Sequence, residues 1–307
     1  MTRAVRWVGS GIVILLLAYA ATKLSWRAIA VTVRHASPQL LATAVAVNLL
    51  SLAIKGVRWS IFLRAIGIES VSLAIRASFV GAGVNNIMIA NSGEAARVLL
   101  VARQGRVSRS SVLATLALDR IFDPLCYVLL LVGAAWILPL PPQLEHAQAI
   151  AAAMLCALVA AMIWLIVSRA PDRTGVEATP WRARVRVFRA ELGELASLPR
   201  MSAAFALSVV VWALQLLAFA LVARASGVAL PIAGSVAALL LTNAGLVLRA
   251  TPANVGYFQF AYAVAAAPFG VPTNAAIAAA LLLQAVQIIP VTVLGMLWAP
   301  RFVRSTR

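Results

Sequence analysis

Long apolar stretches separated by short polar segments run along almost the whole chain. Windows such as "AIAAAMLCALVAAMIWLIVS" and "AAIAAALLLQAVQIIPVTVLGMLW" exceed the roughly 18 apolar residues that indicate a transmembrane helix. The pattern predicts about six full spans, each long enough to cross a hydrocarbon core of about 30 Å. These spans cover residues 5–22, 38–64, 109–138, 147–168, 201–223 and 274–299.

Two further apolar regions are interrupted near their middle by polar or helix-breaking residues. Residues 72–104 contain "GVNNIMIANSG" and residues 230–270 contain "RATPANVG". Because each region is too long for one span, we expect each to form a re-entrant helical hairpin. Non-helical backbone at membrane depth is tolerated only where protein buries it or where it lines a wet cavity. Each break therefore predicts a cavity.

The composition agrees with an all-α, polytopic membrane helical bundle. Hydrophobic residues make up 63% of the chain and charged residues 11%, whereas a globular domain has about 25% charged residues. The net charge of +17 would suggest nucleic acid in a soluble chain. Here the arginines cluster between spans, where they set topology and meet anionic headgroups, so we expect no nucleic-acid partner.

Cys126 and Cys156 lie within predicted spans and suggest neither a disulfide nor a metal site.

Basic residues between the spans predict the orientation of the chain. The Arg-rich segment 169–200 is expected in the cytoplasm, and the first span is expected to remain uncleaved. With six spans, both termini are then cytoplasmic and the protein is multi-pass. Lys23, Arg27 and Arg34 would lie outside, and we expect them on an interfacial amphipathic stretch.

In this topology the two interrupted regions enter the membrane from opposite faces, and their sequences are similar at corresponding positions. Gly105 corresponds to Gly270, and Asp119 corresponds to Gln284. Inverted repeats of this kind occur in many transporters. We therefore predict a single transmembrane domain over residues 1–307, with a first inverted half at 38–138, a cytoplasmic Arg-rich loop at 169–200 and a second inverted half at 201–299.

Charged residues accompany the first break. Glu94 and Arg97 are three positions apart, and Asp119 and Asp123 are four apart with Arg120 beside them. A lone charge at mid-membrane costs about 2.5–3.5 kcal/mol, so these side chains should be paired or wet. Two interpretations stay open: a structural ion cluster, or a pathway for an anionic headgroup or for coupled protons.

A half-helix that begins inside the membrane offers free N–H groups and a positive dipole end, which suit a phosphate. At the second break, Arg249 either faces such a phosphate or extends to the membrane interface. The candidate pathway and headgroup residues are Asn85, Asn86, Gly93, Glu94, Arg97, Asp119, Arg120, Asp123, Arg249, Pro252, Asn254, Gly256, Gln259 and Gln284.

A set of residues recurs in a characteristic order and spacing along the chain: Arg58-Trp59, Asn85, Gly93-Glu94, Arg97, the acid Asp119, Arg120, Asp123, Pro252, Gly256 and Gly270-Val271. In this pattern the chain resembles the flippase-like membrane proteins, which are the transmembrane domain of lysylphosphatidylglycerol synthases and its stand-alone relatives. The resemblance covers nearly the whole chain and implies structural or interface roles for Arg58 and Trp59. It also implies a bacterial plasma-membrane protein whose relatives move aminoacylated phospholipid between leaflets, or are suspected of moving other lipid or polyprenyl-phosphate carriers.

Departures from the family pattern lie mainly in the second half. The Pro-x-Pro-Gly-Gly-x-Gly motif is reduced to "ATPANVG", and the proline before Gly93-Glu94 is missing. The family often has Glu at the position of Gln259 and Arg near that of Gln284. Our hypothesis is that two amides replace a former ion pair. The sequence lacks the aminoacyl-transferase domain, so we do not expect lipid aminoacylation.

We expect a lipid translocase that moves a phospholipid or a polyprenyl-phosphate-type anionic lipid between leaflets. One alternative is a non-transporting partner of envelope or glycan machinery, recruited through residues 169–200. The other is a headgroup-modifying enzyme with Glu94 or Asp119 as general base. No catalytic constellation or metal-ligand cluster stands out, so we expect no enzyme, no cofactor and no metal. The expected partners are membrane lipids, with envelope-biosynthesis proteins as further candidates.

Overall fold

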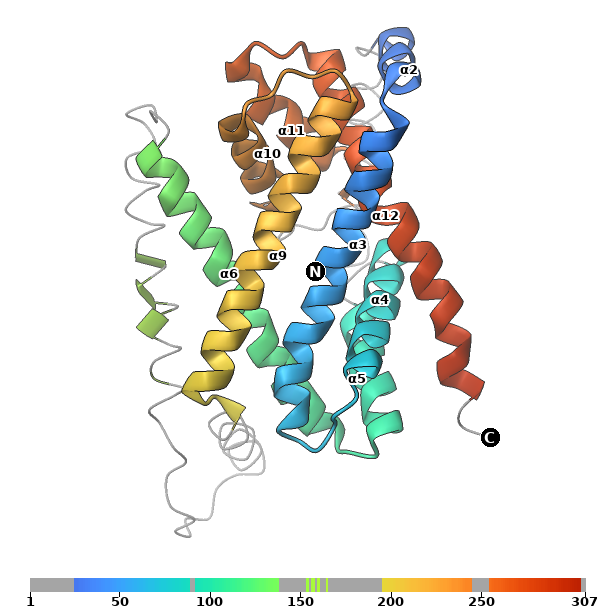
Figure 1. Ribbon diagram of the computed structural model, residues 1–307, viewed down its shortest axis with the longest axis vertical. Helices are drawn as coiled ribbons and strands as arrows, with labels where there is room; N and C mark the ends of the chain where they lie inside the picture. Colours follow the sequence, from blue (N-terminus) through green and yellow to red (C-terminus); the bar gives the residue numbers. More distant parts are fainter. Residues whose placement is uncertain are drawn as a thin grey trace, which may run out of the picture. The chain divides into compact units, whose positions relative to one another are not determined.

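The computed structural model describes residues 25–88, 92–137, 195–244 and 254–304, with scattered positions between 153 and 164. These residues are helical and contain no strand, which confirms the all-α prediction for this part of the chain. Figure 1 shows the arrangement. The elements are α2 (Trp26–His35), α3 (Pro38–Arg64), α4 (Val71–Ile87), α5 (Ser92–Gly105), α6 (Arg109–Ile137), α9 (Leu198–Ala225), α10 (Ile232–Ala244), α11 (Tyr257–Ala266), the 3-10 helix η4 (Ala267–Phe269) and α12 (Thr273–Arg304).

Three helices of the described residues are long and apolar enough to cross a membrane. They are Pro38–Arg64, Leu198–Ala225 and Thr273–Ala299. At 1.5 Å per residue, even the shortest of them extends about 40 Å, against a hydrocarbon core of about 30 Å. The predicted spans at 5–22 and 147–168 lie wholly or mostly outside the described residues, so the number of spans stays a prediction.

Polar caps and glycines fix several helix ends. The Ser70 hydroxyl accepts a hydrogen bond from the Leu73 amide at 3.3 Å at the start of α4. Ser108 accepts one from the Ser111 amide at 3.0 Å at the start of α6. Such caps satisfy N–H groups that have no partner within the helix. Gly270 has φ of 74° just before α12, a left-handed conformation that glycine adopts without a steric cost.

Both interrupted regions form pairs of packed helices, and the contacts of the first pair show that its helices are antiparallel. In the first, Asn85 near the end of α4 contacts Gly93 at the start of α5, and Ser78 further back contacts Arg97 further on. In the second, the Tyr257 hydroxyl of α11 donates to the Leu241 carbonyl of α10 at 2.8 Å. The pairing follows the predicted hairpins, while their re-entry into a membrane stays a prediction.

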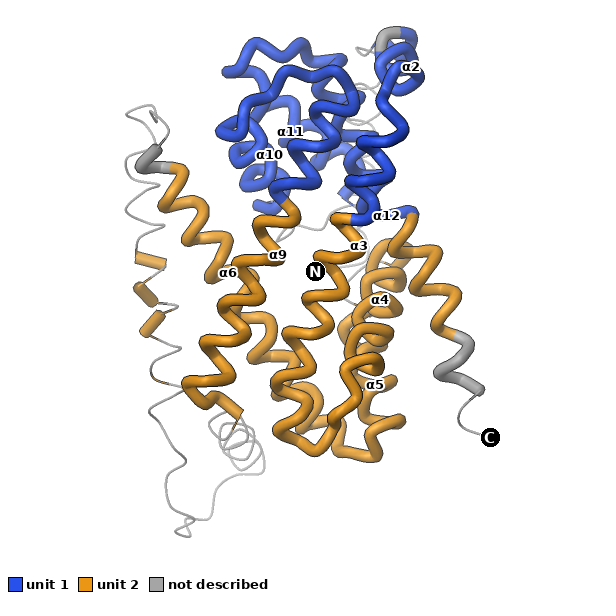
Figure 2. Tube along the Cα trace, in the orientation of Figure 1, with its two compact units in different colours: residues 1–46, 216–289 blue, residues 47–215, 290–307 orange. Residues whose placement is uncertain are grey.

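The chain divides into two compact units, coloured separately in Figure 2. Unit 1 contains residues 1–46 and 216–289, and unit 2 contains residues 47–215 and 290–307. The α10–α11 pair belongs to unit 1, and the α4–α5 pair and α6 belong to unit 2. The long helices α3, α9 and α12 each contribute one segment to each unit. The inverted relation between the two sequence halves stays a prediction.

Two apolar clusters, each with residues of α3, build the core of unit 2. The first contains Trp59 with residues of α4, α5 and α6, among them Val98 and Leu116. The second contains Phe62 with residues of α6 and α9, among them Phe122. Because both clusters include residues of α3, this helix is the common support of α5 and α6.

The short helix α2 belongs to unit 1 and has one buried apolar anchor. Ile29 packs against Ile277 and Ala278 of α12, while Arg27 and Arg34 are exposed. The two arginines therefore lie on a helix with an apolar and a polar side, as predicted. Its position at a membrane interface stays a prediction, and Lys23 lies outside the described residues.

Candidate functional site

Arg58 of α3 joins three helices of unit 2 through its guanidinium group. Its Nε donates to Asp119 Oδ1 at 2.8 Å, and its Nη1 donates to Asp123 Oδ1 at 3.0 Å. Nη1 also donates to Ser208 Oγ of α9 at 2.8 Å. Only 1% of the Arg58 side chain is exposed. Asp119 and Asp123 reach the same guanidinium because residues four apart share one face of a helix.

Arg97 of α5 is also buried, but its hydrogen bonding is incomplete. Its Cζ lies 4.3 Å from the centroid of the Trp59 ring, which is a cation–π contact. Its Nη2 donates to Ser78 Oγ at 3.2 Å and lies 3.9 Å from Asp119 Oδ2. Among the described residues, its Nε has no hydrogen-bond partner. A buried guanidinium with a distant counter-charge and an unpaired N–H lowers the stability of the fold, unless a further group binds it.

Glu94 and Arg120 form an ion pair between α5 and α6. Arg120 Nε donates to Glu94 Oε2 at 3.2 Å, and Arg120 Nη2 pairs with Glu94 Oε1. Arg120 Nη1 donates to Asp123 Oδ2 at 3.4 Å. The pair is more accessible than Arg58, with side-chain exposures of 44% for Arg120 and 26% for Glu94.

We call these side chains, together with Lys55, the ionic network. Lys55 Nζ lies 3.9 Å from Asp123 Oδ1. The network holds four basic and three acidic groups, so it carries one formal positive charge in excess. Its members are Lys55, Arg58, Glu94, Arg97, Asp119, Arg120 and Asp123.

The structure brings together the five charged residues that the sequence marked beside the first break. It also adds two basic residues that the sequence did not predict as part of this site. Arg58, expected in a structural or interface role, lies at the centre of the network, and Lys55 was not predicted at all. The available signal was their spacing: two basic residues three positions apart inside the apolar span 38–64, away from its ends, lie on one helix face.

The two asparagines of the first break have protein partners. Asn85 Oδ1 accepts a hydrogen bond from the Gly93 amide at 2.8 Å, at the start of α5. Asn86 Nδ2 donates to Thr292 Oγ1 of α12 at 3.0 Å. A Cβ atom on Gly93 would overlap the carbonyl oxygen of Gly81, because α4 and α5 touch backbone to backbone there. A phosphate at this helix start would therefore compete with Asn85 for the Gly93 N–H.

The second break, in unit 1, contains uncharged groups among its described residues. The Gly256 amide donates to Gln259 Oε1 at 2.7 Å, and Gln259 Nε2 donates to Gln284 Oε1 at 2.6 Å. Gly256 and Asn254 both have positive φ, at 92° and 56°. The predicted residues Arg249 and Pro252 lie outside the described residues. No group of metal-ligating side chains occurs in the described part of the chain.

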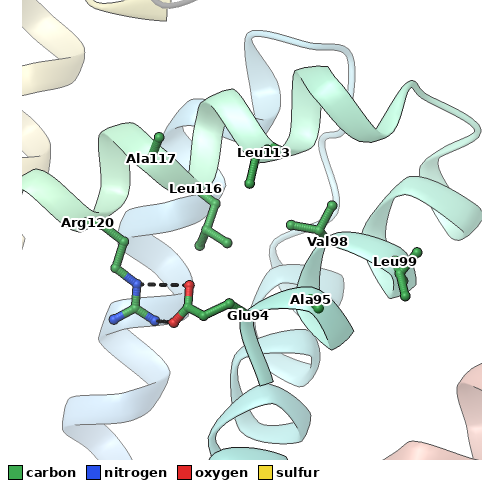
Figure 3. Close-up of a pocket in the computed structure, with 8 residues that line it drawn as sticks. All are labelled: Glu94, Ala95, Val98, Leu99, Leu113, Leu116, Ala117 and Arg120. Carbon is green, nitrogen blue, oxygen red and sulfur yellow. Dashed lines mark hydrogen bonds and ion pairs between the residues drawn. The ribbon is translucent and has the colours of Figure 1, made fainter. Parts of the chain in front are cut away.

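A pocket of about 620 Å³ lies between α5 and α6 in unit 2. Figure 3 shows the Glu94–Arg120 pair at one end and the side chains of Val98 and Leu116 between the two helices. This combination of apolar walls and one ion pair suits an amphiphilic ligand. The lining residues are Glu94, Ala95, Val98, Leu99, Leu113, Leu116, Ala117 and Arg120.

Comparison with protein families gives one match over most of the chain. The family model described as lysylphosphatidylglycerol synthase TM region matches residues 6–295. The match confirms the resemblance seen in the sequence and includes all residues of the ionic network. No curated protein sequence matched the chain.

Proposed function

The chain belongs to the lysylphosphatidylglycerol synthase TM region family, and from this premise we propose that it is a lipid translocase of a bacterial plasma membrane. Its proposed substrate is a phospholipid or a polyprenyl-phosphate-type anionic lipid, which it moves between leaflets. The observation that carries the proposal is the ionic network of unit 2, in which Arg58, Arg97 and Asp119 are buried. Ionisable side chains inside membrane domains usually mark a substrate or ion pathway.

The charge balance of the network favours an anionic ligand. Four basic groups face three acidic groups, and Arg97 Nε lacks a partner among the described residues. A phosphate oxygen would supply both the missing charge and the missing acceptor. Arginine binds phosphate well because its N–H groups form a planar fork.

The proposal gives the three arginines different roles. Arg58 holds Asp119 and Asp123 in place, since its bonds to both carboxylates are short and buried. Asp119 therefore neutralises Arg97 only weakly, across 3.9 Å. Arg97 and Arg120 are the proposed headgroup contacts, and Arg58 is a positioning residue.

The helix lengths support re-entrant hairpins, which are part of the proposal. α4 has 17 residues and α5 has 14. At 1.5 Å per residue these helices extend about 25 Å and about 21 Å, less than the hydrocarbon core of about 30 Å. α10 and α11 are shorter still, with 13 and 10 residues. Both helix pairs can thus turn back within a membrane.

Leaflet exchange in proteoliposomes tests the proposal. The probes are headgroup-labelled phosphatidylglycerol, its lysyl derivative and a polyprenyl phosphate. We expect the wild type to exchange at least one of them, and Arg97→Ala and Arg120→Ala to abolish exchange while the protein remains folded. Arg103→Ala is the matched control, because Arg103 is an exposed arginine on α5 outside the network.

Two outcomes would contradict the proposal. Exchange that persists in both arginine variants would exclude the network as the route. A folded wild type that moves none of the probes would instead favour a non-transporting partner of envelope machinery. Mass spectrometry of the recovered lipids separates transport from headgroup modification, since an enzyme changes the lipid mass and a translocase does not.

A further inference from the structure

The walls of the pocket between α5 and α6 are more apolar than the binding of a lipid headgroup alone would require. Six of its lining residues are apolar, and only Glu94 and Arg120 are charged. A polar headgroup that filled this space would leave its own hydrogen-bonding groups without partners along most of the wall. The chemistry of the wall matches a hydrocarbon chain.

The pocket is closed by the protein core on one side and opens to the surroundings on the other. Val98 and Leu116 are buried members of the unit 2 core. Leu113, in contrast, is 50% exposed, and Leu99 is also exposed. In a membrane domain, apolar side chains on the outside of the helices meet lipid acyl chains, so the pocket opens toward lipid.

We propose that this pocket binds one acyl chain of a phospholipid and that the phosphate of the same lipid binds Arg120 at the pocket rim. The inference rests on the proposed function and deepens it, because the substrate is then held by its tail as well as by its headgroup. The rim is suited to this role because the Arg120 side chain is 44% exposed while it lines the same pocket.

Glu94 and the lipid phosphate would then compete for the same guanidinium. Arg120 gives Glu94 two parallel contacts, through Nε and Nη2, which is also the geometry in which arginine binds a phosphate. Arg120 keeps its bond to Asp123 through Nη1 while the other two nitrogens change partner. Glu94 thus displaces the phosphate when the lipid leaves.

The test is photo-crosslinking of the full-length protein in detergent, where binding is measured without transport. The probe is a phosphatidylglycerol with a diazirine near the end of one acyl chain, and the labelled peptides are mapped by mass spectrometry. Labelling is expected in α5 and α6. Leu113→Trp, which adds bulk at the pocket mouth, should reduce it about tenfold, the effect of moderate overpacking.

The matched control is Leu129→Trp. Leu129 is also an exposed leucine of α6, at 36%, and it does not line the pocket. Its labelling should stay at the level of the wild type. Labelling that is absent from α5 and α6, or that Leu113→Trp does not reduce, would overturn the proposal.

Two rim variants and a second probe test the phosphate contact. Arg120→Gln should weaken labelling by phosphatidylglycerol, whereas Glu94→Gln should strengthen it by removing the competing carboxylate. A diacylglycerol with the same diazirine keeps both acyl chains but lacks the phosphodiester headgroup, and should label less. Equal labelling by both probes, with no effect of Arg120→Gln, would reduce the pocket to a hydrocarbon site and refute the phosphate contact.

The failure of this inference can be told apart from the failure of the proposed function. Pocket labelling without leaflet exchange would support the acyl-chain site and contradict translocation. Leaflet exchange at the wild-type rate in Leu113→Trp, with no pocket labelling, would support translocation and contradict the acyl-chain site.

Discussion

Gln259 of α11 donates a hydrogen bond from its Nε2 to Oε1 of Gln284 on α12, across 2.6 Å. Both side chains are buried. The resemblance seen in the sequence implies an acidic residue at the position of Gln259 and a basic residue near that of Gln284. Their contact supports the hypothesis that two amides occupy the place of an ion pair. A neutral pair avoids most of the desolvation cost that two buried charges incur.

Gln259→Glu alone should destabilise the protein, because it buries a carboxylate without a cation. Adding Gln284→Arg should restore stability by supplying the counter-charge. Thermal unfolding in detergent of the wild type, both single variants and the double variant measures the coupling, expected within about 0.5–3 kcal/mol for residues in contact. Effects that simply add would contradict the hypothesis.

Arg58→Ala should destabilise unit 2 strongly, by about 3–5 kcal/mol, since it leaves Asp119 and Asp123 without their buried partner. Arg58→Lys should rescue little, because lysine cannot donate from three directions in a planar fork. Unfolding of each variant in detergent measures the effect. Arg64→Ala, at an exposed position of the same helix, is the control. Lost transport with unchanged stability would make Arg58 a substrate contact instead.

Gly93→Ala should separate α4 from α5, because its Cβ would overlap the Gly81 carbonyl oxygen. Backbone atoms cannot move aside as a flexible side chain can, so we expect a loss of about 1–3 kcal/mol. Gly133→Ala is the matched control, since nothing lies within 4 Å of the added atom. Chemical unfolding compares the two, and equal stabilities would refute the close contact.

The stacking of Arg97 on Trp59 can be measured separately from other effects of the ring. Trp59→Phe keeps an aromatic face and Trp59→Leu removes it, so the leucine variant should be less stable by about 0.5–2 kcal/mol. Both variants lose the hydrogen bond from Trp59 Nε1 to Thr115 Oγ1, so that bond cancels in the comparison. The difference should vanish when both are made in an Arg97→Ala background. A difference that persists there would assign it to apolar packing.

The all-α class and the bounds of individual long helices were predictable, because in a membrane protein the length of an apolar stretch sets the length of the helix. The span predicted at 38–64 has the same bounds as α3, and the one predicted at 109–138 differs from α6 by one residue. Part of the site was predictable because charged residues are rare within apolar segments and therefore conspicuous. Asp119, Arg120 and Asp123 were identified in this way.

The partners of those charges could not be predicted, since they lie on other helices. Ser78 and Ser208 bind arginines of the network, yet a serine in an apolar helix gives no signal of its own. The close approach of Gly81 to Gly93 depends on how α4 crosses α5, and a single sequence does not specify that geometry. The same holds for the hydrogen bond between Asn86 and Thr292, which are far apart in the chain and meet only because α4 packs against α12.

The single positive excess of the ionic network has a consequence for the voltage across the membrane. An empty network is acted on by the transmembrane potential, at about 2.3 kcal/mol per elementary charge per 100 mV for a full crossing. A bound phosphodiester carries one negative charge and makes the loaded network electroneutral. If the proposed phosphodiester ligand binds there, the loaded and empty states would therefore differ in their response to voltage. The helices α10 and α11 carry no acidic or basic residue, so they add nothing to this response.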